Sequence, residues 1–342
     1  MSSEKELNIG VIGCGHWGPN HIRTFSGLPG ARVVMAADPD AKQRARLAGS
    51  FKGIEFVADH RAVIDSDEIE AVVISTPTET HYEIARQALE AGKDVLCEKP
   101  LTLKYRESIA LAELAEKKKR ILMVGHIFIY NNGILELRRI LQEGVLGQPR
   151  YLHSERTNLG PFRSDVNVVY DLASHDIAIF NYLLDSRPTR VTAAGMSYLQ
   201  DGVEDMAFIT MYYPNNIIAN CHVSWLHPRK IRELTIVGSA KMITWNDLSA
   251  TGPLAVYAKN VKTDQYYDDF GHFNLLIKEG DITIPHVPMQ EPLKQQDSAF
   301  LTAVQKREQP VSDGRFAADI VAVLEAANQS IQRNGESVQI EH

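Results

Sequence analysis

The chain has 342 residues, of which 44% are hydrophobic and 23% charged, and its formal net charge is −7 at pH 7. A chain of this length and composition predicts a globular protein of two domains. The acidic balance, with no basic stripe, argues against nucleic acid or an anionic membrane surface as a partner.

Cysteine usage and hydropathy bear on the compartment. Cys14, Cys97 and Cys221 are scattered and form no CxxC pair. This usage is typical of a reducing compartment and offers no disulfide framework. We see neither the apolar core of a signal peptide nor an apolar run of membrane-spanning length. We therefore expect a cytoplasmic protein.

The first third of the chain alternates apolar strand patterns with helix patterns. Such alternation predicts a doubly wound parallel sheet of the α/β Rossmann class, with right-handed crossovers. The predicted strands span residues 9–12, 32–37, 55–57, 71–75, 94–97 and 121–124. The predicted helices span residues 16–27, 40–50, 60–66, 79–91 and 104–119, and a further helix over 131–143 leads out of the domain.

From about residue 150 the pattern changes to successive strands. Runs of strands interrupted by one strong helix predict an α+β domain with a large, mostly antiparallel open sheet. The predicted strands span 150–156, 190–197, 207–213, 217–225, 232–238 and 241–245, and the predicted helices span 170–184, 293–307 and a last segment ending at Asn334. Residues 260–290 are predicted to be rich in loops. The expected domains are 1–125 and 126–342.

A glycine-rich loop follows the first strand, where Gly13, Gly15 and Gly18 form the pattern GxGxxG and open a helix. In a dinucleotide site the first glycine permits a tight turn and the second lets the pyrophosphate approach the backbone. The third lets helix and strand pack closely. Asp38 ends the next strand, where a carboxylate receives the ribose hydroxyls and repels a 2′-phosphate. The pattern predicts NAD rather than NADP, and assigns residues 1–125 to NAD binding.

Further cofactor contacts are expected from the loop, from the ends of the following strands and from the next helix. The complete predicted set is Gly13, Gly15, His16, Trp17, Gly18, Asp38, Ser75, Thr76, Pro77, His81, Glu98 and Lys99. Open α/β sheets bind their ligands at the carboxyl ends of the strands, and Lys99 follows the strand predicted over 94–97. Its ammonium is placed there to hold a substrate hydroxyl, and the fixed φ of Pro100 stiffens the turn.

Asp171 and His175 lie four residues apart in the helix predicted over 170–184. At 100° per residue both point to the side of Tyr182, and the opposite arc is apolar. A carboxylate at this spacing orients an imidazole and raises its basicity. An exposed Asp–His pair without chemistry is the alternative. Asp176 falls in the apolar arc, so we expect it to be buried with hydrogen-bond partners.

Taken in order, the glycine loop, Glu98-Lys99-Pro100 and Asp171-x-x-x-His175-Asp176 resemble the Gfo/Idh/MocA oxidoreductases, the family of glucose–fructose oxidoreductase and inositol dehydrogenase. The resemblance implies that Lys99 holds the reacting hydroxyl, that His175 is the general acid/base and that Asp171 orients it or relays protons. Hydride loss from a carbinol needs such a base and a cation beside the developing alkoxide. It requires no metal, and no ligand spacing suggests one.

Two stretches, 156–167 and 224–230, resemble the branch that oxidises nucleotide-linked sugars at C3, such as UDP-N-acetylglucosamine 3-dehydrogenases. The resemblance implies a UDP-N-acetylhexosamine substrate, used in the synthesis of a surface polysaccharide or lipid. Cationic side chains in this domain suit a diphosphate, with solvated charges on a sheet rim as the alternative. Tyr170 or Trp225 is expected to contact a sugar or base face. The predicted substrate residues are Lys99, Arg156, Asn158, Arg163, Tyr170, Asp171, His175, Trp225 and Lys230.

Three other functions fit the same motifs. The nearest is a free-polyol dehydrogenase such as inositol dehydrogenase. The others are an NAD-sensing regulatory protein with a degenerate site and an NAD-assisted glycosidase. The family resemblance also implies a homo-oligomer, a dimer or a tetramer, formed through the exposed face of the antiparallel sheet.

Overall fold

The structure is a computed structural model that describes residues 6–263 and 275–341. The chain forms two compact units. The first runs to Tyr130 and includes Gln290–Glu325, and the second contains Asn131–Met289 and Ala326–Glu341. The predicted boundary, which put everything after residue 125 in the second domain, is therefore wrong for the carboxyl-terminal return to the first unit.

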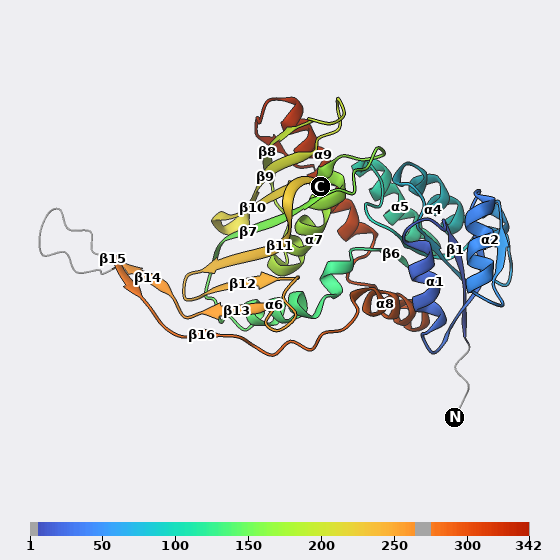
Figure 1. Cartoon of the computed structure of the whole chain (residues 1–342), viewed down its shortest axis with the longest axis horizontal. Coiled ribbons are helices and arrows are strands. Elements are labelled where there is room, and N and C mark those ends of the chain that lie inside the picture. The colour runs from blue at the N-terminus through green and yellow to red at the C-terminus, as the bar shows by residue number, and fades with distance from the viewer. Residues whose placement is uncertain (1–5, 264–274, 342) are drawn as a thin grey trace, which may run out of the picture. The chain divides into compact units, whose positions relative to one another are not determined.

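The first unit is built on a six-stranded parallel sheet, which confirms the predicted Rossmann class. Its strand order is β3-β2-β1-β4-β5-β6. The strands β2 and β3 lie on one side of β1 and the strands β4 to β6 on the other, so the order of the strands reverses between β1 and β4. Every strand lies close to its predicted range (Figure 1): β1 (Leu7–Ile12), β2 (Ala31–Ala37), β3 (Glu55–Val57), β4 (Ala71–Ile74), β5 (Asp94–Cys97) and β6 (Leu122–Val124).

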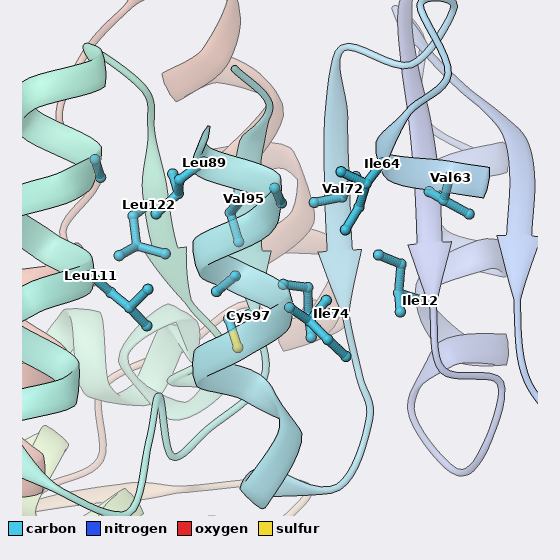
Figure 2. Packing of buried hydrophobic residues seen from close by; sticks show 14 of the residues in the cluster. Ile12, Val63, Ile64, Val72, Ile74, Leu89, Val95, Cys97, Leu111 and Leu122 are labelled. Atoms are coloured by element: carbon cyan, nitrogen blue, oxygen red, sulfur yellow. The ribbon is translucent and has the colours of Figure 1, made fainter. Parts of the chain in front are cut away.

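Helices connect these strands and cover the sheet. They are α1 (Gly18–Ser26), α2 (Ala41–Ser50), α3 (His60–Ile64), α4 (His81–Glu90) and α5 (Tyr105–Lys118), with short 3₁₀ turns at Thr78–Thr80 and Ile127–Tyr130. Figure 2 shows α3, α4 and α5 packing on one face of the sheet through aliphatic side chains such as Val63, Leu89 and Leu111. The strands present Ile12, Ile74 and their neighbours to this layer, so burial on both faces explains their unbroken apolar runs.

The carboxyl-terminal helix α8 (Pro292–Lys306) returns to the first unit because its apolar and polar contacts lie there. Phe300 packs its ring edge-on against Phe25 of α1, with 6.3 Å between ring centroids. The amide of Val124, at the end of β6, donates to the carbonyl of Ser312 at 2.8 Å. Helix α9 (Gly314–Gln332) follows and carries the chain from the first unit into the second.

The second unit contains a nine-stranded sheet of order β16-β13-β12-β11-β7-β10-β9-β8-β17. All neighbours are antiparallel except β7 and β10, which confirms the mostly antiparallel prediction. Its strands are β7 (Pro149–Leu159), β8 (Arg190–Met196), β9 (Met206–Tyr213), β10 (Ile217–Ser224), β11 (Leu226–Gly238), β12 (Met242–Asn246), β13 (Leu254–Tyr257), β16 (Ile282–Thr283) and β17 (Val338–Gln339). Helices α6 (Asn132–Gln142) and α7 (Ser174–Leu184) belong to this unit.

Two segments of the second unit differ from prediction. The stretch predicted as loop contains β14 (Asn260–Thr263), which pairs with β15 (Leu275–Lys278) in a separate two-stranded sheet. The part of that stretch spanning 264–274 lies outside the described residues. The helix predicted over 170–184 is interrupted, because Val169–Ala173 forms a π turn before α7 begins at Ser174. In a π turn the hydrogen bonds run from i to i+5, so the angular spacing of an α-helix does not apply to Asp171.

Candidate functional site

The glycine loop has the geometry that the motif predicts. Gly13 has a φ of +93°, and a Cβ there would meet the backbone carbon of Ser75 at 2.7 Å. A Cβ on Gly18 would lie 2.0 Å from the carbonyl oxygen of Gly13. Gly15 differs, because nothing lies within 4 Å of its added Cβ. The first and third glycines are therefore required by packing, and the second leaves open the space that a pyrophosphate fills in such sites.

Asp38 follows β2 and faces this loop. Its Oδ2 accepts from the amide of Cys14 at 2.7 Å, and its Oδ1 accepts from the amide of Asp40 at 2.8 Å. Arg44 donates to the backbone carbonyl of Asp38 at 2.7 Å. The carboxylate is thus fixed beside the glycine loop, where the sequence placed a ribose-binding acid.

A cavity of about 1030 Å³ opens at the carboxyl ends of β1, β2 and β4. A cavity of this size suits a dinucleotide portion, and the carboxyl edge of the sheet is where such folds bind ligands. Six predicted cofactor residues line it, namely Gly13, Gly15, Asp38, Ser75, Thr76 and Pro77. The loop glycines, the acid and the end of β4 therefore converge on one site within the first unit.

The same cavity is lined by residues that the sequence reasoning missed. They come from the segment after β3 and from the first turns of α4, and include Asp59, His60, Arg61, Glu83 and Gln87. The sequence did offer a signal for these residues. In a doubly wound sheet β3 lies beside β2, so the segment after β3 lies near Asp38 at the end of β2. The apolar pattern of β3 is weak, so the segment that follows it was not included among the predicted cofactor residues.

The other predicted cofactor residues, His16, Trp17, Gly18, His81, Glu98 and Lys99, do not line this cavity. His81 is buried, and its two ring nitrogens lie 2.9 and 3.0 Å from the carbonyl oxygens of Thr76 and Pro100. His81 therefore ties the end of β4 to the turn after β5. Its predicted contact with the cofactor stays a prediction, and its observed role is to hold two site segments together.

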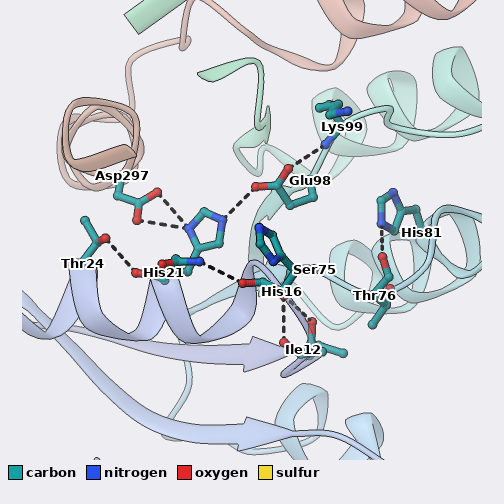
Figure 3. A network of polar contacts seen from close by, with 12 residues as sticks. Ile12, His16, His21, Thr24, Ser75, Thr76, His81, Glu98, Lys99 and Asp297 are labelled. Atoms are coloured by element: carbon teal, nitrogen blue, oxygen red, sulfur yellow. Dashed lines mark hydrogen bonds and ion pairs between the residues drawn. The ribbon is translucent and has the colours of Figure 1, made fainter. Parts of the chain in front are cut away.

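Lys99 follows β5 at the same edge of the parallel sheet (Figure 3). Its amide donates to Oε2 of Glu98 at 3.2 Å. The neighbouring His126, which follows β6, was not predicted. Its side chain is buried, and burial together with the charge of Lys99 lowers its pKa to about 3. A neutral imidazole therefore stands beside the Lys99 ammonium, and its position directly after a strand at this edge was the signal available in the sequence.

In the second unit, side-chain donors from two separate stretches hold Asp171. The indole Nε1 of Trp225 donates to its Oδ2 at 3.1 Å, and the Arg163 guanidinium donates to its Oδ1 at 3.2 Å. Arg163 also pairs with Asp165 at 2.5 Å. These contacts join the π turn to both sequence stretches, 156–167 and 224–230, that resemble the nucleotide-sugar branch. His175 follows on α7, one residue after that helix begins.

Of the three residues predicted to share one face, Tyr182 has a contact that was not predicted. The Arg138 guanidinium of α6 stacks 4.0 Å from the centroid of the Tyr182 ring. Tyr182 therefore packs against α6. His175 and Tyr182 both lie in α7 and keep their α-helical spacing, whereas the spacing from either of them to Asp171 crosses the π turn.

Two predicted substrate residues, Arg156 and Trp225, have structural roles that correct the sequence interpretation. Arg156 is 3% exposed and forms a two-pronged ion pair with Asp176, at 2.9 and 3.1 Å. Trp225 is 1% exposed and serves as a donor to Asp171 rather than as an open platform for a sugar. Tyr170 is also buried. The prediction that Asp176 is buried with partners is confirmed.

The remaining predicted substrate residues are more accessible. Asn158 donates to the carbonyl of Gly160 at the end of β7, and Arg163 is partly exposed. Lys230 is exposed on β11, as is its neighbour Arg229, which was not in the predicted set. Cations available to an anionic substrate are therefore found at positions 229 and 230 in this unit, and Arg156 is committed to its internal pair.

Across residues 6–263 and 275–341, no group of three or more His, Cys, Asp or Glu side chains is arranged to hold a metal ion. Within the same part of the chain, no helix is both long and apolar enough to cross a bilayer.

Comparison with protein families matches both units. The model of an oxidoreductase family with an NAD-binding Rossmann fold matches residues 7–126. The model of the GFO/IDH/MocA C-terminal domain matches residues 134–244. Together these matches cover more than half of the chain.

Individual proteins show the same similarity. Inositol 2-dehydrogenase 2 of Saccharopolyspora erythraea is 32% identical over 226 residues, which are 64% of this chain and about two thirds (66%) of that protein. The UDP-N-acetylglucosamine 3-dehydrogenase of Acidithiobacillus ferrooxidans is 32% identical over 260 residues, 75% of this chain and 79% of that protein. A solved structure of UDP-N-acetylglucosamine 3-dehydrogenase from the same organism is 26% identical with a TM-score of 0.78, covering 96% of this chain and 99% of that chain.

Proposed function

Since the chain belongs to the GFO/IDH/MocA oxidoreductase family and its cofactor is NAD, we propose that it oxidises a sugar secondary hydroxyl to a ketone. The substrate we propose is a UDP-N-acetylhexosamine, oxidised at C3 for the synthesis of a surface polysaccharide or lipid. One observation carries this choice. Arg163 and Trp225, from the two stretches that resemble the nucleotide-sugar branch, both donate to Asp171. The similarity to a UDP-N-acetylglucosamine 3-dehydrogenase at 32% identity supports it.

The proposed roles follow from the chemistry of carbinol oxidation. NAD, when bound, supplies the hydride acceptor for the hydrogen on the reacting carbon. His175 accepts the hydroxyl proton as general base, and Lys99 stabilises the developing alkoxide with its ammonium. Asp171 orients His175, and its own orientation is fixed by Trp225 and Arg163. The step would balance, because bound NAD would take the hydride from the carbon and His175 takes the proton from the oxygen.

We assign the diphosphate contacts to exposed cations. Arg229 and Lys230 are exposed on β11, whereas Arg156 is buried in its pair with Asp176. A charge-assisted hydrogen bond to a phosphate is worth about 1.5–3 kcal/mol, roughly ten- to a hundredfold in affinity. A UDP-sugar should therefore be used better than its free sugar, and UDP alone should compete.

A free-polyol dehydrogenase is the alternative, and the similarity to an inositol 2-dehydrogenase at 32% identity favours it. A panel of UDP-sugars and polyols tested for NADH formation separates the two. Turnover of UDP-N-acetylglucosamine or its epimer, with competition by UDP, supports our proposal. Turnover of myo-inositol or free glucose as efficient as that of any UDP-sugar, without inhibition by UDP, replaces it with the polyol reaction. NAD binding without turnover of any sugar would favour a regulatory protein.

We further propose that the chain forms a homo-oligomer in the cytoplasm. Tyr151, Phe208 and Ile218 lie on one face of neighbouring strands β7, β9 and β10, and each is more than 40% exposed. Apolar groups gathered on one face of a sheet are typical of a self-association surface. The three cysteines are free and buried, as suits a reducing compartment. Sedimentation of wild type and of Ile218→Asp tests the assembly, since the charged variant should shift toward monomer.

A further inference from the structure

A chain of buried polar contacts runs beneath Lys99 in the first unit (Figure 3). Asp297 on α8 faces Nδ1 of His21 on α1, with distances of 3.0 and 3.1 Å from its two oxygens. Nε2 of His21 lies 3.0 Å from Oε1 of Glu98. The other oxygen of Glu98 accepts the Lys99 amide at 3.2 Å. Residues far apart in sequence thus form one continuous path that ends at the Lys99 backbone.

The burial of this path makes its charges informative. His21 and Asp297 are fully buried and Glu98 nearly so. Burial lowers the pKa of His21, but Asp297 and Glu98 outweigh this effect and raise that pKa to about 10. A protonated imidazole has a donor on each nitrogen, so His21 donates to Asp297 and Glu98 at once. Such a group among buried carboxylates is costly unless every hydrogen bond is made, and here both nitrogens are satisfied.

Glu98 is held in one orientation by what surrounds it. One carboxylate oxygen faces His21 and the other faces the Lys99 amide. A Cβ on Gly125 would lie 3.2 Å from the Glu98 carboxylate, so the glycine after β6 leaves the room that the carboxylate occupies. A change in the orientation of Glu98 would remove the carboxylate oxygen that accepts from the Lys99 amide and fixes the start of the Lys99-Pro100 turn.

We propose that Asp297, His21 and Glu98 form a positioning network for Lys99, in which His21 orients Glu98 and Glu98 fixes the backbone from which the Lys99 side chain extends. None of the three is a catalytic residue in this account. They act through Lys99, and the inference rests on the proposed role of Lys99 in holding the reacting hydroxyl. Small displacements of a group that contacts the reacting atoms cost large factors in rate.

The test removes one carboxylate charge at a time and determines whether the resulting loss of hydride-transfer rate depends on the Lys99 side chain. Glu98→Gln leaves the His21–Asp297 pair intact, and Asp297→Asn leaves the His21–Glu98 pair intact, so each variant retains a neutralised imidazolium. Each is made in wild type and in a Lys99→Met background. Single-turnover hydride transfer is measured with the most active sugar of the substrate panel, together with NAD affinity and melting temperature.

We expect each substitution to slow hydride transfer about tenfold to a hundredfold in wild type. NAD affinity should fall less than the rate of hydride transfer, since none of the three residues lines the cavity beside the glycine loop. In the Lys99→Met background neither substitution should slow the residual rate further, because the group they position is gone. Asp94→Asn is the matched control. Asp94 opens the strand that Glu98 follows and is equally buried, and it pairs with Arg307 at 2.8 Å. It should lower the melting temperature and leave the rate unchanged.

The outcomes separate this inference from the proposed function. A Lys99→Met variant that retains near-normal turnover overturns the role of Lys99 itself. If Lys99→Met is inactive but Glu98→Gln and Asp297→Asn transfer hydride at the wild-type rate, the positioning network is overturned. The three residues would then only attach α8 to the rest of the first unit. Equal losses in both backgrounds overturn it as well, since the substitutions would then act elsewhere. If Asp297→Asn fails to fold, Glu98→Gln decides the matter, because it leaves both buried partners of α8 and α1 paired.

Discussion

The glycine loop of the first unit and the Asp171 site of the second are held by different means. In the first, the shape of the site is set by the backbone, since Gly13 and Gly18 occupy positions where a Cβ would collide with neighbouring atoms. In the second, side chains hold side chains, and Asp171 depends on Trp225, which lies 54 residues later in the chain. A backbone requirement leaves a local sequence motif, whereas a long-range side-chain contact leaves none. The cofactor site is therefore readable from sequence and the substrate site largely is not.

The largest expected effect tests the chemistry on which both units depend. Removing a general acid/base costs about 10²–10⁴ in rate. We expect His175→Ala and Lys99→Ala each to lose at least the lower amount in kcat while melting and binding NAD as wild type does. Steady-state kinetics, calorimetry with NAD and thermal melts check this. Near-normal turnover by either variant would contradict the assigned roles.

Asp38 tests the backbone-built site. If its carboxylate receives the ribose hydroxyls, Asp38→Ala should weaken NAD binding by about 1.5–3 kcal/mol, roughly ten- to a hundredfold, and relax discrimination against NADP. Titration of both cofactors into wild type and variant measures this. The control is Asp40→Ala, which removes the cap that accepts the Lys42 amide and should cost about 1 kcal/mol of stability without changing cofactor choice. Tighter binding of NADP than NAD by wild type would overturn the assignment.

Trp225 tests the side-chain-built site. Trp225→Phe keeps the buried ring but removes the donor to Asp171, while Arg163 still holds the other oxygen. The loss of one net hydrogen bond of about 1 kcal/mol predicts a fall in kcat of about fivefold. Trp245→Phe, at another fully buried tryptophan of the same unit, is the control and should leave kcat unchanged. Equal effects of the two variants on kcat would show that packing, and not the orientation of Asp171, is responsible.

The last prediction concerns stability against pH and leaves kcat aside. The pKa of His21 is raised in the folded protein from 6.5 to about 10 by Asp297 and Glu98, against the effect of burial. Its stabilising contribution is therefore fully present below about pH 6.5 and is lost as the pH rises through about 10. The difference in free energy of unfolding between wild type and His21→Asn should shrink by a few kcal/mol, on the order of 1–3, between pH 7 and 10. A difference that stays constant over this range would contradict a charged His21.

The fold was largely predictable because burial on both faces imposes long apolar runs on a parallel sheet. Strands β1 to β6 lie close to their predicted ranges, and the change to antiparallel strands after residue 150 marked the second unit. The return of α8 to the first unit was not predictable, because the contact of Asp297 with His21 joins residues 276 positions apart. The π turn at Asp171 was missed for a different reason. Its residues fit an α-helical pattern equally well, and the extra residue in the turn is visible only in the structure.

The candidate site shows the same division. The glycines Gly13 and Gly15 line one cavity with the strand-end residues Asp38, Ser75 and Thr76, as expected of the carboxyl edge of a parallel sheet, and their contact with NAD stays a prediction. Arg156 was misassigned as a substrate residue, since a charged residue in a strand gives no local sign of its partner. The burial of Asp176 was predicted from its place in an apolar arc, but that partner was found only in the structure.

The central claim is that the protein transfers a hydride from C3 of a UDP-N-acetylhexosamine to NAD. The most direct measurement uses UDP-N-acetylglucosamine carrying deuterium at C3, incubated with the enzyme and NAD. We predict that the deuterium appears in the reduced nicotinamide, that hydride transfer is slower than with the unlabelled sugar, and that the product is a 3-keto sugar. Reduced cofactor without deuterium, or formed only from a free polyol, would contradict the account.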